Sequence, residues 1–213
     1  MSGHLNRYPA RSNDDLVRLV REHPLAWIVS GTAENFRASL LPVMAETDEQ
    51  GAVSRLVGHF ARSNDQYKLL LQDPRAVVLV LGTNGYISVS WMQDKTQAPS
   101  WNYASAQFFV DVEFFAEPQP LQQHLREFSD AMESVTARAP GSIAWNVDQM
   151  GPRYASLSRG VIGFSARVRE VRARFKLGQD ERDDVFRDII GGLEYGGATE
   201  LQALMKDFNP GRG

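Results

Sequence analysis

Short apolar runs bounded by glycine, proline, asparagine and aspartate fill the first half of this chain. Runs in which apolar and polar residues alternate predict strands, because successive side chains of a strand point to opposite faces. The predicted strands are Leu25–Ser30, Phe36–Val43, Ser54–Phe60, Ala76–Leu81, Tyr86–Trp91, Gln107–Ala116 and Val161–Phe175. The segment Gly82-Thr83-Asn84-Gly85 is typical of a hairpin turn between two of them. About six to seven antiparallel strands of this length predict a barrel.

Apolar residues spaced three or four apart predict helices beside this barrel. The predicted helices begin near Ser12 and cover about Asn64–Leu71, Leu121–Ala137, a weakly helical Ile143–Leu157, and one or two segments within Glu181–Phe208. We therefore expect a mainly β chain of the α+β class. Residues 1–178 form the predicted barrel domain with its N-terminal and mid-chain helices, and residues 179–213 form a C-terminal helical extension of the same domain.

The composition is that of a folded globular protein and excludes several kinds of site. Hydrophobic residues make up 43% of the 213 residues and charged residues 23%, close to the average for globular domains. The chain has no cysteine, which excludes disulfides, thiolate metal sites and iron–sulfur clusters. The formal net charge of −3 disfavours binding to a phosphate backbone, so we expect no nucleic-acid partner.

No segment has the pattern of a membrane span or a secretory signal. The stretch Met1–Asp15 is polar, and the longest apolar run, Ala76–Leu81, is far shorter than the roughly 20 residues that a spanning helix needs. The expected location is the cytoplasm, without membrane contact.

His59 is the histidine with the most unusual surroundings. It lies in Gly58-His59-Phe60-Ala61-Arg62-Ser63-Asn64, where a predicted strand gives way to a short helix. A neutral imidazole at a strand end can bind haem iron, and Arg62 can meet a carboxylate or phosphate of the same ligand. The alternative is a structural histidine bonded to a backbone carbonyl, with Arg62 an ordinary surface cation.

A polar loop flanked by aromatic residues is the second candidate. Trp91 and Trp101 lie on either side of it, next to Tyr86 and Tyr103. Flat apolar rings beside hydrogen-bonding groups suit a planar cofactor or a small polar substrate, although the same rings could close one end of the barrel. A zinc site would need three of His4, His23, His59 and His124 to converge, and their spacing gives no support for that.

These stretches resemble the PaiB-type proteins, a family of FMN-binding negative transcriptional regulators with a dimeric split β-barrel. The motifs that carry the resemblance are His23-Pro24-Leu25-Ala26, Gly58-His59-Phe60-Ala61-Arg62-Ser63-Asn64, Tyr86-Ile87-Ser88, Pro99-Ser100-Trp101-Asn102-Tyr103, Ile162-Gly163-Phe164 and Lys176-Leu177-Gly178-Gln179. Two departures stand out: the regulators typically have a proline where Val89 stands, and a longer, more basic loop than Met92–Ala98. In these respects the chain is more similar to the piperazate synthases, a branch of the same family.

That branch binds haem b and closes N5-hydroxyornithine into the cyclic hydrazine piperazate, with loss of water. The resemblance implies a homodimer with His59 as the axial ligand of the iron. The cofactor-binding residues that we predict are His59, Arg62, Ser63, Trp91 and Trp101. The candidate catalytic residues are Lys68, Lys95, Thr96, Gln97 and Tyr103.

Two other functions stay open at the level of the sequence. One is an FMN-binding regulator or flavin oxidoreductase of the same fold, in which Arg62, Ser63 and Lys68 would hold the FMN phosphate. The other is a cofactor-free dimeric binding protein with an aromatic pocket.

Overall fold

The computed structural model describes residues 7–32, 34–136 and 139–212, which form two compact units. The barrel unit comprises Pro24–Leu79 and Phe108–Val171, and the terminal unit comprises Met1–His23, Val80–Gln107 and Arg172–Gly213. The strands are β1 (Leu25–Gly31), β2 (Phe36–Thr47), β3 (Val53–Ala61), β4 (Arg75–Ile87), β5 (Ser100–Phe115) and β6 (Val161–Lys176). The helices are α1 (Asn13–Glu22), α2 (Gln66–Leu70), α3 (Pro118–Val135), α4 (Pro152–Ser158), α5 (Asp183–Tyr195) and α6 (Thr199–Phe208), with 3-10 helices η1 (Val89–Trp91) and η2 (Val147–Met150).

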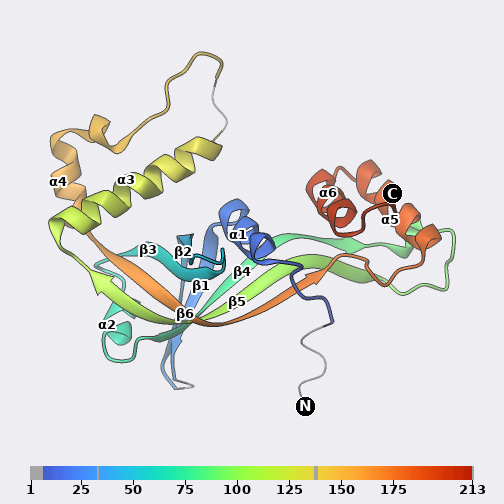
Figure 1. Ribbon diagram of the computed structural model, residues 1–213, viewed down its shortest axis with the longest axis horizontal. Coiled ribbons are helices and arrows are strands. Elements are labelled where there is room, and N and C mark those ends of the chain that lie inside the picture. The colour runs from blue at the N-terminus through green and yellow to red at the C-terminus, as the bar shows by residue number, and fades with distance from the viewer. Residues whose placement is uncertain (1–6, 33, 137–138, 213) are drawn as a thin grey trace. The chain divides into compact units, whose positions relative to one another are not determined.

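The six strands close a barrel in the order β1-β2-β3-β6-β5-β4. The recorded pairs β1–β2, β1–β4, β2–β3 and β3–β6 are antiparallel. This arrangement confirms the predicted mainly β barrel with flanking helices (Figure 1). Among the described residues, no helix is both long enough and apolar enough to cross a membrane.

Alternating side chains fill the interior of the barrel unit. Phe60 and Phe164 are buried there with their ring centroids 5.3 Å apart. Gly58 makes room for this pair, because a Cβ atom at that position would lie 2.7 Å from the Phe164 ring. A core of this kind fixes which residues of β3 point inward and which point outward.

The outward face of β2, β1 and β4 in the barrel unit is apolar. Trp27 of β1 has Leu40 of β2 on one side and Leu79 of β4 on the other in the strand register. These three side chains are 47%, 43% and 37% exposed, respectively. Leu25 of β1 and its partner Pro42 of β2 extend the same face. The surface is therefore a contiguous apolar patch on three strands, which we call the β1 face.

In the terminal unit, the last two helices lie on the extended ends of the strands (Figure 1). A Cβ atom on Gly192 of α5 would lie 2.2 Å from the ring of Trp91. On α6, the buried Met205 accepts a weak hydrogen bond from Asn102 at 3.4 Å. Phe208 stacks on Phe175 with centroids 5.1 Å apart. The C-terminal helices are thus built into the core of this unit.

The predicted hairpin at Gly82–Gly85 is wrong. These residues lie inside β4, which joins two of the predicted strands, and the predicted strand Tyr86–Trp91 ends at Ile87 before η1. The glycines serve close packing instead of a turn. A Cβ atom on Gly82 would lie 2.4 Å from Leu19 Cδ1 of α1, and one on Gly85 would lie 2.8 Å from Leu201 Cδ2 of α6.

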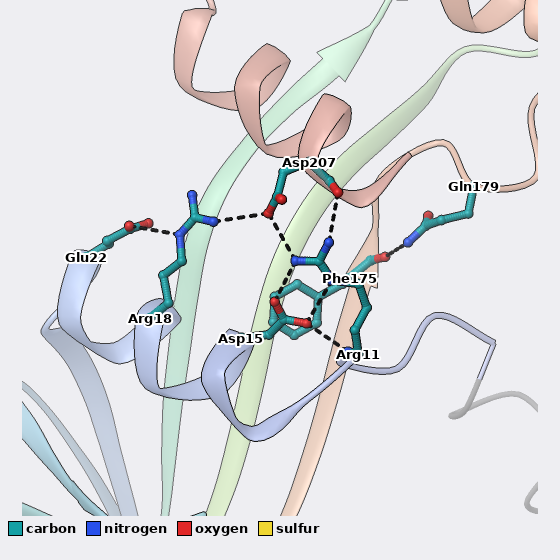
Figure 2. Close-up of polar contacts among 7 residues, drawn as sticks. All are labelled: Arg11, Asp15, Arg18, Glu22, Phe175, Gln179 and Asp207. Atoms are coloured by element: carbon teal, nitrogen blue, oxygen red, sulfur yellow. Dashed lines mark hydrogen bonds and ion pairs between the residues drawn. The ribbon is translucent and has the colours of Figure 1, made fainter. Parts of the chain in front are cut away.

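A charged network ties α1 to α6 in the terminal unit (Figure 2). The Arg11 guanidinium donates to Asp15 Oδ1 at 2.8 Å and to Asp207 Oδ2 at 3.0 Å. Arg18 donates to the same Asp207 oxygen at 3.1 Å and to Glu22 at 2.9 Å. The Arg11 guanidinium also lies 3.7 Å from the centroid of the Phe208 ring.

Asp15 is the buried member of this network, with an exposed fraction of 7%. Ser12 occupies the N-cap position of α1 but makes no side-chain capping bond. Asp15 instead reaches back and accepts a hydrogen bond from the Arg11 backbone N–H at 2.8 Å. Burial alone would raise the pKa of Asp15, but the side-chain and backbone hydrogen bonds from Arg11 outweigh it and bring the pKa below its ordinary value.

The variant Asp15→Asn should therefore unfold more easily. We expect a loss of about 1.5–3 kcal/mol in the free energy of unfolding at pH 7, as for hydrogen bonds to a charged group, measured by urea denaturation. The loss should persist above the unfolded carboxyl pKa of about 3.9 and shrink as pH falls through the lower folded-state pKa. Asp14→Asn, an exposed neighbour in the same helical turn, is the control. Equal effects of the two variants would contradict this account.

Candidate functional site

His59 lies on β3 with its side chain directed away from the barrel core. Its neighbour Phe60 is fully buried in that core, and adjacent side chains of a strand point to opposite faces. The position paired with His59 on β6 is Gly163. The imidazole is half-buried because residues of α3 cover it.

The imidazole of His124, on α3, is in contact with His59. His59 Nδ1 and His124 Nε2 are 3.3 Å apart, and the rings meet edge to face with centroids 5.5 Å apart. His124 is only 6% exposed. At this distance one of the two nitrogens must carry the proton and the other must accept it. The two histidines are 65 residues apart in the chain, so this contact is made by the fold alone.

Aromatic rings surround the two imidazoles. The Phe128 ring, one helical turn beyond His124, lies 5.5 Å from His59 and 5.7 Å from His124 between centroids. The Phe115 ring lies 5.7 Å from His124. Gly163 is what admits that ring, because a Cβ atom there would lie 2.2 Å from Phe115. We call these residues, His59, Phe115, His124, Phe128 and Gly163, the histidine cluster.

Burial keeps both imidazoles of the cluster neutral at pH 7. Desolvation lowers the pKa of His59 below its ordinary value. Desolvation, with a further contribution from the neighbouring His59, lowers the pKa of His124 to about 4. Among the described residues, no hydrogen-bond partner reaches the other ring nitrogen of His59, Nε2. A neutral imidazole with a free nitrogen is the form that binds a metal ion.

Of the predicted residues just beyond His59, Arg62 and Ser63 lie in the turn between β3 and α2, and Lys68 lies within α2. Arg62 donates its backbone N–H to the Gly160 carbonyl at 2.8 Å, and its exposed guanidinium makes no ion pair within the described chain. Ser63 is exposed in the same turn. Lys68 bonds to Asp65 at 3.2 Å, and both side chains are well exposed. Arg62 is therefore the uncommitted cation nearest to His59 in sequence.

In the terminal unit, Asp94 organises the polar loop. It accepts hydrogen bonds from the Thr96 hydroxyl at 2.6 Å, from Gln97 Nε2 at 2.7 Å and from Arg182 Nη2 at 2.9 Å. These hydrogen bonds, above all those from the Thr96 hydroxyl and backbone N–H, hold the pKa of Asp94 well below its usual range. Lys95 donates to the backbone carbonyls of η1 at 3.1 and 3.3 Å. The three predicted loop residues, Lys95, Thr96 and Gln97, thus stabilise the loop itself.

The predicted aromatic residues lie in different surroundings. Trp91 is half-buried against Gly192 of α5. Trp101 is 55% exposed and meets Tyr86 edge to face at 6.0 Å. Tyr103 is half-buried on β5. Only Trp101 among these three offers a largely open ring face.

His124 and Asp94 were not among the site residues predicted from the sequence. His124 lies three residues after Leu121 and four before Phe128, so it shares the apolar face of a predicted helix. Its place on that face indicated from the sequence that its side chain would be buried. No comparable signal marked Asp94. Among the described residues, no three histidine or acidic side chains converge on a metal site, and His4 lies outside those residues. His23 contacts Thr83 at 3.2 Å.

Residues 5–170 match a family model described as "Putative FMN-binding domain". This chain belongs to that FMN-binding family. A relative in the family's PaiB-type line is the protease synthase and sporulation protein PAI 2 of Bacillus subtilis (strain 168), 24% identical over 156 residues, or 71% of this chain and 72% of that protein. The predicted resemblance to PaiB-type proteins is confirmed.

Two solved structures resemble the FMN-binding-family fold of this chain. The FAD and haem binding protein from Mycobacterium smegmatis has a TM-score of 0.57 at 17% identity, covering 86% of this chain and 79% of that one. The flavocytochrome Anf3 from Azotobacter vinelandii has a TM-score of 0.56 at 13% identity, covering 82% and 73%. At these identities the likeness concerns the fold.

Proposed function

We propose that this protein binds haem b through Nε2 of His59 and uses it to form an N–N bond. The observation that carries the proposal is the neutral, half-buried imidazole of His59, whose Nδ1 contacts His124 while Nε2 has no partner in the described part of the chain. A single neutral imidazole is the usual proximal ligand of haem iron. The donor set at the histidine cluster therefore fits haem, and Arg62 is a suitable cation for a propionate.

The reaction that we propose is the dehydrative closure of N5-hydroxyornithine to piperazate, as the resemblance to piperazate synthases implies. The N–O bond breaks, an N–N bond forms to the α-nitrogen, and water leaves, with no net oxidation or reduction. When bound, haem would supply an iron that polarises the N–O bond. The protein must neutralise the α-ammonium and deliver a proton to the departing oxygen.

We assign these remaining tasks to the predicted residues as a group. Lys68, Lys95 and Tyr103 carry groups that can exchange a proton. Arg62 holds either a haem propionate or the substrate carboxylate. Ser63, Thr96 and Gln97 can donate hydrogen bonds, while Trp91 and Trp101 offer apolar rings. Because Thr96 and Gln97 are bonded to Asp94, we propose that they act by shaping the loop. We propose the cytoplasm as the location.

Flavin binding is the second candidate function, favoured by the family match over residues 5–170. In a flavin protein, Arg62, Ser63 and Lys68 would hold the FMN phosphate. The protein would then be a PaiB-like regulator or a flavin oxidoreductase, and His59 would have no ligand role.

We also propose a homodimer that buries the β1 face. An apolar patch of this kind on a folded protein marks an interaction surface. The central Trp27 lies between Leu40 and Leu79 with no charged side chain among the three. An apolar surface can meet its own copy across a two-fold axis, with Trp27 as the anchor.

The absorption spectrum tests the cofactor. Protein reconstituted with haem should show a Soret band that the variant His59→Ala loses, whereas the control His23→Ala should keep it. A parallel sample is reconstituted with FMN. If this sample binds the yellow flavin while the haem sample shows no Soret band, the haem proposal is overturned in favour of the second candidate.

Mass spectrometry tests the reaction. Haem-loaded protein incubated with N5-hydroxyornithine should give a product lighter by one water molecule that contains an N–N bond, and the His59→Ala variant should reduce the rate to the background of free haem. Unchanged substrate in the presence of a confirmed Soret band would refute the synthase activity and leave haem binding intact.

Light scattering after gel filtration tests the dimer. The native protein should elute at twice the chain mass of 23.8 kDa, and Trp27→Glu should elute as a monomer because two carboxylates cannot be buried unpaired. Trp145→Glu, at another exposed tryptophan of the barrel unit, is the matched control. A dimer that survives Trp27→Glu would rule out the β1 face.

A further inference from the structure

We infer that His124 is a positioning residue for His59, accepting a hydrogen bond from His59 Nδ1–H and so leaving Nε2 unprotonated toward the iron. This inference rests on the proposed function, because it assumes that His59 is the haem ligand. It assigns a role to a second histidine, which contributes the hydrogen-bond partner and has no ligand role of its own.

The 3.3 Å contact admits two arrangements of the protons. If His124 Nε2 carries the proton, His59 Nδ1 is the acceptor and the remaining proton of neutral His59 is on Nε2, where it blocks metal binding. If His59 Nδ1 carries the proton, His124 Nε2 accepts it and His59 Nε2 has a free lone pair. Only the second arrangement gives His59 a ligand nitrogen. Metal-binding histidines generally donate their other ring N–H to a hydrogen-bond acceptor, and His124 Nε2 is the acceptor within reach here.

The cluster holds the acceptor in place from several sides. His124 shares the buried face of α3 with Leu121 and Phe128, which fixes the helix against the barrel wall. The Phe115 ring packs edge to face on His124 at 5.7 Å, and Gly163, the residue paired with His59, makes space for that ring. Gly163, which pairs with His59, and His124 of α3 are therefore linked through the Phe115 ring.

A second contact restrains the helix along its length. Arg126, two residues beyond His124, forms a bidentate ion pair with Asp148 of η2, one bond measuring 2.7 Å. Bidentate pairs of this kind fix orientation as well as distance. With α3 restrained on both faces, the His124 nitrogen remains in reach of His59, which is the requirement for a partner that orients a ligand.

The test compares variants of His124 in haem-loaded protein. His124→Phe keeps a ring of similar shape and removes the acceptor, so haem affinity should fall by about 10–100-fold and the iron–histidine stretching frequency of the ferrous protein should decrease. His124→Gln places an amide oxygen near the position of Nε2 and should restore most of both quantities. Phe128→Leu removes a ring from the same cluster without touching the hydrogen bond. It should lower the melting temperature and change the stretching frequency by less than His124→Phe does.

The outcomes separate this inference from the proposed function. If His59→Ala loses the Soret band while His124→Phe keeps native affinity and stretching frequency, the positioning role is refuted and haem ligation stands. Equal losses in His124→Phe and His124→Gln, with Phe128→Leu changing the frequency as much, would show a packing role only and also refute it. If His59→Ala keeps the Soret band, the proposed function and this inference fail together.

Discussion

The contact between His59 and His124 is the constraint on which the functional account of this protein depends. It joins strand β3 of the barrel wall to helix α3, through two nitrogens 3.3 Å apart. Removing two imidazoles from water disfavours their charged forms, so burial keeps the pair neutral. Within the part of the chain that the structure describes, no group bonds to the second nitrogen of His59. A polar pair in an apolar setting is well determined only when each member is satisfied. Ligand binding at His59 Nε2 would give that nitrogen a partner.

In the terminal unit, hydrogen bonds to one carboxylate hold a polar loop in one conformation. Asp94 gathers the hydroxyl of Thr96, the amide of Gln97 and the guanidinium of Arg182. Charge-assisted bonds to one carboxylate are stronger than bonds between neutral groups, which explains how a segment rich in polar residues is fixed. Side chains that hold the loop can support a site without touching its substrate.

The alternation of apolar residues was sufficient to predict the barrel and most of its strands, because a two-residue period directly reports a sheet with one buried face. The glycines of β4 were misread for a physical reason. A glycine that permits a turn and one that admits a neighbouring side chain look alike in sequence. Only the positions of Leu19 and Leu201 in the fold show that Gly82 and Gly85 are of the second kind.

The candidate site was predicted in part. His59 was recognisable from its position at the end of a strand, and α3 from its apolar spacing. The pairing of His59 with His124 could not be predicted, because it depends on how a helix docks on a barrel wall. The role of Asp94 could not be predicted for a related reason. One of its partners is Arg182, which lies 88 residues later in the chain and reaches Asp94 only in the fold.

Nitrogen-15 NMR of the imidazole rings, recorded at neutral pH on protein free of haem, shows which nitrogen of His59 carries the proton. We predict a neutral His59 ring with its proton on Nδ1 and an unprotonated Nε2, together with a neutral His124. A charged His59 ring, or a neutral one with its proton on Nε2, would contradict this prediction.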